Sequence, residues 1–232
     1  MFLRSKLQYL RRIGIIFKNQ TNLSRRSIAT SGVRLAHDES HDAPISRFPV
    51  PDVQELPDDL KEKFGKSKFL PNVFGALSYR PDELRAFINY HEVLMRDSSN
   101  VTKADKEMIA VVVSADNQCL YCVATHSALY RLHSRNPILA DQLSTNWRMA
   151  DLDIRQKAIL DFATTVAACH SPADEQFERL YENGMNHDDA WDIGALASFL
   201  SMSNRLAHFL RVKPNPEFYL IGRIPASEKN NK

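Results

Sequence analysis

The sequence has no apolar run long enough to cross a membrane, because a spanning helix needs about 20 consecutive apolar residues. The longest apolar candidate near the N-terminus, residues 13–17, is also too short for the core of a secretory signal. No segment alternates apolar and polar residues with the period of two that indicates a strand. We therefore expect an all-α fold, which excludes thioredoxin, where a Cys-x-x-Cys pair lies beside a βαβ unit.

Asp and Glu are absent from residues 1–37, which contain eight of the 30 Lys and Arg residues. Subtracting those eight leaves 22 basic against 28 acidic residues in the remainder, a net charge of −6. An acidic body gives no support for nucleic-acid binding, because such binding is usually accompanied by a basic surface.

The basic N-terminus has the pattern of a mitochondrial transit peptide, since Leu3, Leu7 and Phe17 recur at helical spacing opposite basic residues. We expect residues 1–36 to direct the chain to the mitochondrial matrix and the mature protein to begin near Ala36. The alternative is a disordered basic arm that binds nucleic acid or acidic lipid.

Prolines are concentrated between residues 38 and 81, where six of the eleven occur and forbid any long helix. Between residues 38 and 81 we predict an extended chain with one short helix, 58–64, begun after a proline, and we assign residues 37–70 to a Pro-rich extended arm. Such an arm has no core of its own, so we expect it to lie on the domain or on a neighbouring subunit. The domain is assigned to residues 71–221 and an irregular tail to residues 222–232.

The other helices are predicted from apolar spacing together with start and stop signals, such as Thr102 as an N-cap and Gly184 as a stop. A chain of 232 residues with 44% hydrophobic content can bury one domain core. Cys169 is expected to be a buried structural thiol within that core. The predicted helices cover residues 81–96, 103–115, 118–133, 137–143, 153–168, 172–182 and 188–210.

Two of the three cysteines, an acid and an imidazole lie within residues 107–126. Cys119, Cys122 and His126 stand at i, i+3 and i+7, so a helix here would place both sulfurs and the ring on one stripe. Glu107 lies twelve residues before Cys119, which is too far along a single helix that rises about 1.5 Å per residue.

A turn near Asn117 would bring the acid back to this stripe. Asp116 or Asn117 can act as the N-cap of a new helix, so the segment is predicted to form a helical hairpin. Glu107 lies ten residues before that bend and His126 nine after it, so antiparallel helices would set them level. The prediction is one constellation of an acid, an imidazole and two thiols.

Two simpler interpretations of the cysteine pair remain open. The pair could consist of two small core residues, because free cysteine is often buried. It could instead bind zinc together with His126, but no second Cys/His pair follows at finger spacing, and His133 would have to be the fourth ligand. Nothing in the sequence requires a metal, a flavin or a haem, so no cofactor is expected.

The spacing Glu-x11-Cys-x2-Cys-x3-His resembles the alkyl hydroperoxidase D (AhpD)-like branch of the carboxymuconolactone decarboxylase superfamily. Residues 71–87 and 203–209 are similar to flanking blocks of its peroxidase-related subgroup, so the resemblance covers roughly residues 48–221. One departure is Tyr121, because AhpD itself has a histidine directly before the second cysteine. Decarboxylase members lack the cysteine pair, so the pair favours thiol redox chemistry over lactone decarboxylation.

The resemblance implies an AhpD-like helical bundle with thiol-dependent peroxidase or disulfide oxidoreductase activity. A hydroperoxide would be the substrate, an external thiol or dithiol the reductant, and a homo-oligomer, trimer or hexamer, the assembly. One alternative is a non-enzymatic redox-sensing or interaction protein. Another is decarboxylase-like or isomerase-like acid–base chemistry on a small lactone, in which the cysteines are incidental.

Within the expected site, Glu107 and His126 would form a proton relay and the two cysteines a redox disulfide. A helix dipole would favour a thiolate on Cys119, but it is worth only about 0.3–1 kcal/mol at an exposed site. Cys122 lies at i−4 from His126, and a positioned base contributes about 10²–10⁴-fold. We therefore assign attack to Cys122 and resolution to Cys119, as the resemblance also implies.

Overall fold

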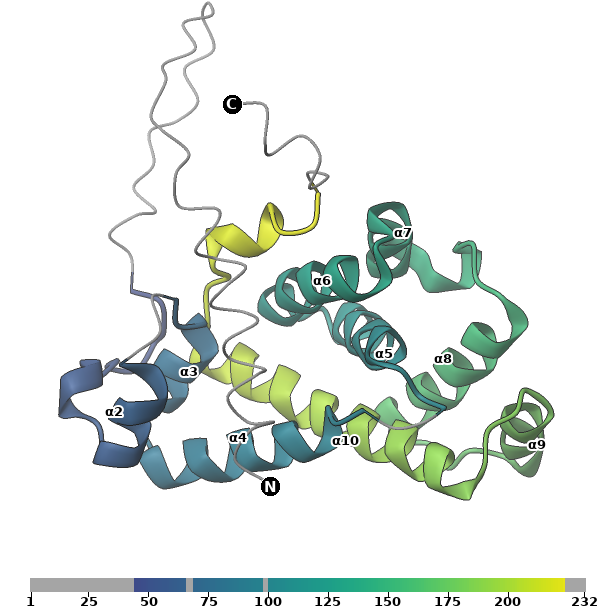
Figure 1. The fold of residues 1–232 in the computed structure, drawn as a ribbon, viewed down its shortest axis with the longest axis horizontal. Helices are drawn as coiled ribbons and strands as arrows, with labels where there is room; N and C mark the ends of the chain where they lie inside the picture. Colours follow the sequence, from purple (N-terminus) through teal and green to yellow (C-terminus); the bar gives the residue numbers. More distant parts are fainter. Residues whose placement is uncertain (1–43, 66–68, 98–99, 224–232) are drawn as a thin grey trace, which may run out of the picture. The chain divides into compact units, whose positions relative to one another are not determined.

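A computed structural model describes residues 44–65, 69–97 and 100–223, and it divides the chain into compact units of residues 1–84 and 85–232 (Figure 1). The expected transit peptide lies outside the described residues. Every regular element in the described residues is a helix, which confirms the all-α prediction. None of these helices is long and apolar enough to cross a membrane.

The first unit contains three short helical elements in its described part, η1 (Val53–Glu55), α2 (Asp58–Phe64) and α3 (Asn72–Leu77). The bounds of α2 are those predicted. The prediction of a single short helix was wrong, because prolines that forbid a long helix still leave room for the six residues of α3. The rings of Phe64 and Phe74 stack with 5.8 Å between centroids and pack α2 against α3.

The second unit is a bundle of helices centred on one helix whose middle, residues 105–114, is buried. The helix α4 crosses from the first unit into this one, and two 3₁₀ helices interrupt the later chain. Its elements are α4 (Pro81–Leu94), α5 (Lys103–Asp116), α6 (Leu120–Ser134), α7 (Pro137–Asn146), η2 (Trp147–Met149), α8 (Ile154–Ala167), α9 (Asp174–Glu182), α10 (His187–Leu210) and η3 (Pro216–Tyr219).

The central helix is α5, which packs against α6, α7, α8 and α10 (Figure 1). Its apolar run, residues 108–113, has no exposed surface on any side. A helix that is apolar all round must be covered all round, so this composition explains why α5 occupies the middle of the bundle. The cysteine-bearing α6 lies directly beside it.

The N-terminus of α5 is fixed by a capping box, which confirms Thr102 as the N-cap. The Asp105 N–H group donates to Thr102 Oγ1 at 3.2 Å, and the Thr102 N–H group donates to the Asp105 carboxylate at 2.9 Å. Arg155 of α8 donates to both oxygens of the same carboxylate at 3.0 Å. This bidentate pair joins the first turns of α5 and α8.

The C-terminal segment is anchored on α6 by a buried arginine. Arg131 donates to the carbonyl oxygens of Phe218 and Ile221 at 2.6 Å. Burial, followed by the neighbouring charge of Arg223, lowers the pKa of Arg131 to about 10. A Cβ on Gly222 would lie 2.7 Å from that of Arg131, and the glycine φ is +75°, so this position requires glycine.

The prediction that Cys169 is a buried structural thiol was wrong. Its side chain is exposed, and its φ is 61°. The helix α8 ends at Ala167, and Cys169 occupies the left-handed position just beyond, where its N–H group donates to the Val166 carbonyl at 2.9 Å. At that position the chain turns away from the helix, and the Cys169 side chain is therefore exposed at the surface. Gly184, with a φ of 82°, follows the end of α9 as predicted.

Candidate functional site

The turn between α5 and α6 consists of Asn117, Gln118 and Cys119. Asn117 is the C-cap of α5, Gln118 has a left-handed φ of 55°, and Cys119 is the N-cap of α6. The prediction that α6 begins at Gln118 under a cap from Asp116 or Asn117 was therefore wrong. A left-handed residue cannot continue a right-handed helix, and the Cys119 N–H group instead donates to the Ser114 carbonyl at 2.8 Å.

Across this turn, the structure brings Glu107 of α5 level with His126 of α6. His126 Nδ1 donates to Glu107 Oε2 at 2.8 Å, and the Glu107 side chain is only 1% exposed. A buried carboxylate requires a partner, and here it fixes the imidazole tautomer with the proton on Nδ1. Nε2 is then left to accept a proton, as a general base requires.

The two cysteine sulfurs are buried and lie 2.7 Å apart. A hydrogen bond from the Cys122 thiol lowers the pKa of Cys119 to about 7, with weaker contributions in the same direction from His208 and His126. The same hydrogen bond, together with burial, raises the pKa of Cys122. Because the two thiols interact across 2.7 Å, the first ionisation belongs to the pair, and the directions of the two shifts favour the thiolate on Cys119.

The spacing of His126 and Cys122 predicts that the imidazole reaches the Cys122 sulfur directly or through one water. Within residues 100–223, the structure has no hydrogen bond between the imidazole and either sulfur, and the His126 hydrogen bond is made to Glu107. Proton exchange between His126 and either sulfur therefore requires a bridging water or a movement of the side chains.

Hydrogen bonds join two side chains of α10 to α5 and to the turn before the cysteine pair. The sequence analysis did not predict that α10 contributes to the site. Asn117 Nδ2 donates to Asn204 Oδ1 at 2.9 Å, and Asn204 Nδ2 donates to Ser114 Oγ at 3.0 Å. His208, one turn later, donates from Nε2 to the Asn117 carbonyl at 3.1 Å. The spacing of Asn204 and His208 at i and i+4 within the late family-like block is the signal that could have indicated them.

Tyr121, which stands where AhpD has a histidine, is 4% exposed and packs edge-on against Phe218 with 6.4 Å between centroids. It forms part of the core beneath the C-terminal segment. His133, the fourth ligand that a zinc site would need, is exposed. In the part of the chain that the structure describes, no three Cys, His, Asp or Glu side chains cluster as metal ligands do.

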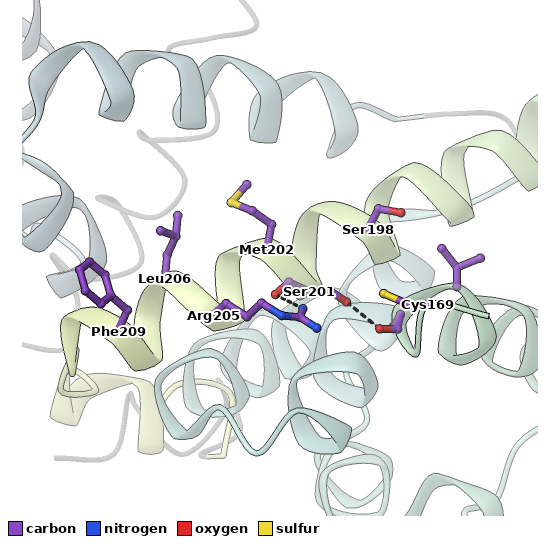
Figure 2. Close-up of a pocket in the computed structure, with 9 residues that line it drawn as sticks. Cys169, Ser198, Ser201, Met202, Arg205, Leu206 and Phe209 are labelled. Atoms are coloured by element: carbon purple, nitrogen blue, oxygen red, sulfur yellow. Dashed lines mark hydrogen bonds between the residues drawn. The ribbon is translucent and has the colours of Figure 1, made fainter. Parts of the chain in front are cut away.

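A groove of about 450 Å³ lies between the end of α8 and the outer face of α10 (Figure 2). Its lining is largely apolar and includes the exposed Cys169 thiol, while Arg205 turns back along α10 and donates to the Ser201 carbonyl at 2.8 Å. None of the four predicted site residues lines this groove. The groove is therefore separate from the acid, imidazole and thiol cluster.

The carboxymuconolactone decarboxylase family matches residues 81–133, which comprise α4, α5 and most of α6. A solved structure described as an alkylhydroperoxidase AhpD core, an uncharacterized peroxidase-related protein from Ralstonia eutropha, is 47% identical, with a TM-score of 0.76. The alignment covers 79% of this chain and 99% of that one. The chain belongs to the AhpD-like proteins of the carboxymuconolactone decarboxylase superfamily.

Two further solved structures extend this comparison. An uncharacterized peroxidase-related protein from a Silicibacter species is 35% identical over 78% of this chain and 97% of that one, with a TM-score of 0.72. The debrominase Bmp8 in complex with a tribromopyrrole is 18% identical over 70% of this chain and 84% of that one, with a TM-score of 0.58, and shares the fold alone. A comparison with curated proteins found no match.

Proposed function

We propose that this AhpD-like protein is a thiol-dependent peroxidase that reduces hydroperoxides through Cys119 and Cys122. The observation that carries the proposal is that the α5–α6 hairpin holds two pairs, in which Glu107 binds the His126 imidazole and the two sulfurs lie 2.7 Å apart. Acid–base chemistry on a lactone would need only the first two groups. The paired thiols, one with its pKa lowered to about 7, favour redox chemistry at neutral pH.

Protons move along the cluster before the reaction. His126 accepts the proton of Cys119, and Glu107 stabilises the imidazolium that forms. Cys122 then passes its own proton to the Cys119 thiolate over the 2.7 Å between the sulfurs. Because the proton crosses only this short distance, the sulfur that carries the negative charge at rest need not be the sulfur that attacks the substrate.

The Cys122 thiolate attacks the terminal oxygen of the hydroperoxide, so that an S–O bond forms and the O–O bond breaks. The alkoxide leaves as an alcohol after it takes the proton from His126. Cys119 then attacks the sulfenic acid at Cys122, forming the disulfide and releasing water. An external dithiol supplies two electrons and two protons that restore both thiols.

The test is reaction of the full chain with one equivalent of cumene hydroperoxide, followed by mass mapping of the cysteines. We expect one Cys119–Cys122 disulfide per hydroperoxide consumed and repeated turnover when dithiothreitol is present. A redox sensor would form the disulfide without sustained turnover. A lactone enzyme would leave both thiols reduced, and either result would reject the peroxidase proposal.

We also propose that the protein is imported into mitochondria, because residues 1–37 carry eight basic and no acidic residues. A fluorescent protein fused behind residues 1–40 is expected to enter mitochondria and to lose the leader there. A matched fusion in which Arg11, Arg12 and Lys18 are replaced by glutamate should stay outside. Diffuse cytosolic fluorescence of the unmodified fusion would contradict import.

A further inference from the structure

Asn204 is a polar side chain in the middle of the mostly apolar helix α10. It is 1% exposed, and its amide lies against α5 and the turn that carries Cys119. A buried amide must satisfy one acceptor and two donor hydrogens, or it destabilises the fold. Its partners therefore determine what it can do at the site.

The neighbouring groups fix the orientation of the amide. Asn117 Nδ2 donates to Asn204 Oδ1 at 2.9 Å, so the oxygen is occupied and the nitrogen lies on the opposite side. One N–H of that nitrogen donates to Ser114 Oγ at 3.0 Å. Asn117 lies two residues before Cys119, and the Ser114 carbonyl accepts the Cys119 N–H, so both partners hold the amide at the turn that carries the cysteine pair. Hydrogen bonding by this amide lowers the pKa of the Cys122 thiol, which is the effect of a donor.

We propose that Asn204 is a further catalytic residue, whose amide N–H stabilises negative charge on the Cys122 sulfur when its proton moves to Cys119. The inference deepens the proposed function and rests on it for the identity of the attacking sulfur. Without this donor, the Cys122 thiolate would be buried beside another sulfur with nothing to replace water. With it, the thiolate accepts one hydrogen bond from Asn204 and a second from Cys119.

The amide differs from the other groups around the pair because it has no charge and does not titrate. His126 and His208 act on Cys119 through their charges, and Glu107 acts through His126. The contribution of Asn204 should therefore persist when Cys119 is removed. That property allows its effect on Cys122 to be measured alone.

The experiment uses the full chain with Cys119→Ser and Cys169→Ser, which leaves Cys122 as the sole cysteine. Labelling its Cβ with carbon-13 gives a chemical shift that reports thiol ionisation without solvent access. Asn204→Leu should raise the pKa of Cys122 by about one to two units, because hydrogen bonds to charged groups are worth roughly that much. Asn204→Asp, which is nearly isosteric, should raise it further because a carboxylate repels the thiolate.

Ser114→Ala is the matched control, because it removes the other acceptor of the same N–H₂ group and leaves Cys122 untouched. It should lower the melting temperature without moving the pKa of Cys122. An unchanged pKa in Asn204→Asp would overturn the proposal and leave Asn204 a structural residue, even if Asn204→Leu failed to fold. The titration needs no peroxide, so a chain that shifts as expected but lacks turnover would reject the peroxidase proposal and retain Asn204 only as the donor that stabilises the Cys122 thiolate.

Discussion

Cys122→Ser is expected to abolish sulfenic acid formation, whereas Cys119→Ser should form a sulfenic acid at Cys122 and retain it. Both variants should lose dithiol-dependent turnover, on the order of 10⁴-fold or more, because each removes one of the two covalent steps. Trapping with dimedone after one equivalent of hydroperoxide, followed by mass mapping, distinguishes the two roles.

The same pair of variants tests the route of the proton. Cys119 has its pKa lowered to about 7, so the parent should form its disulfide with a rate that rises through neutral pH. In Cys119→Ser, Cys122 loses this internal acceptor, so sulfenic acid formation should be slower at neutral pH and should recover as the pH rises. The shift distinguishes a proton relay through Cys119 from direct transfer to His126.

The lowered pKa of Cys119 favours Cys119 as the attacking sulfur, whereas the family resemblance favours Cys122. Trapping the sulfenic acid in the two serine variants decides between them. The thiolate rests on Cys119, and the reactive thiol generally has a pKa near the ambient pH. Rapid trapping at Cys119 in the Cys122→Ser protein, at a rate near that of the parent, would reverse the assignment. Cys169→Ser is the matched control, since its exposed thiol should leave both rates unchanged.

Much of the fold was predictable because it depends on local signals. Caps, prolines and apolar spacing predicted α2 with its observed bounds and α5 to within one residue at its C-terminus. Part of the site was also predictable from local signals. One short turn joins the helix that carries Glu107 to the helix that carries His126, and this places the two side chains level with each other.

What sequence reasoning missed depends on backbone conformation and on distant packing. Nothing in the residue type of Gln118 or Cys169 demands a left-handed φ, yet both adopt one, which moved the start of α6 and exposed a thiol expected to be buried. Asn204 reaches the cysteine pair from about 85 residues along the chain. Its role depends on how α10 packs against α5, and helical periodicity on its own does not determine that contact.

Glu107→Gln and His126→Ala are each expected to lower hydroperoxide turnover by about 10²-fold or more, the usual scale of acid–base catalysis. Glutamine can still accept a hydrogen bond from His126 Nδ1, so the ring should keep its position. It lacks the charge that stabilises the imidazolium, which weakens His126 as a base. His126→Ala removes the base and also leaves Glu107, 1% exposed, without its partner, so this variant should be less stable as well.

The double variant decides whether the two residues act as one relay. If they do, Glu107→Gln combined with His126→Ala should lose little more turnover than His126→Ala alone, because the acid acts through the imidazole. His133→Ala, an exposed histidine two turns further along α6, is the matched control and should retain full turnover. Losses that multiply in the double variant would show that Glu107 acts independently, and unchanged turnover in both single variants would reject the relay.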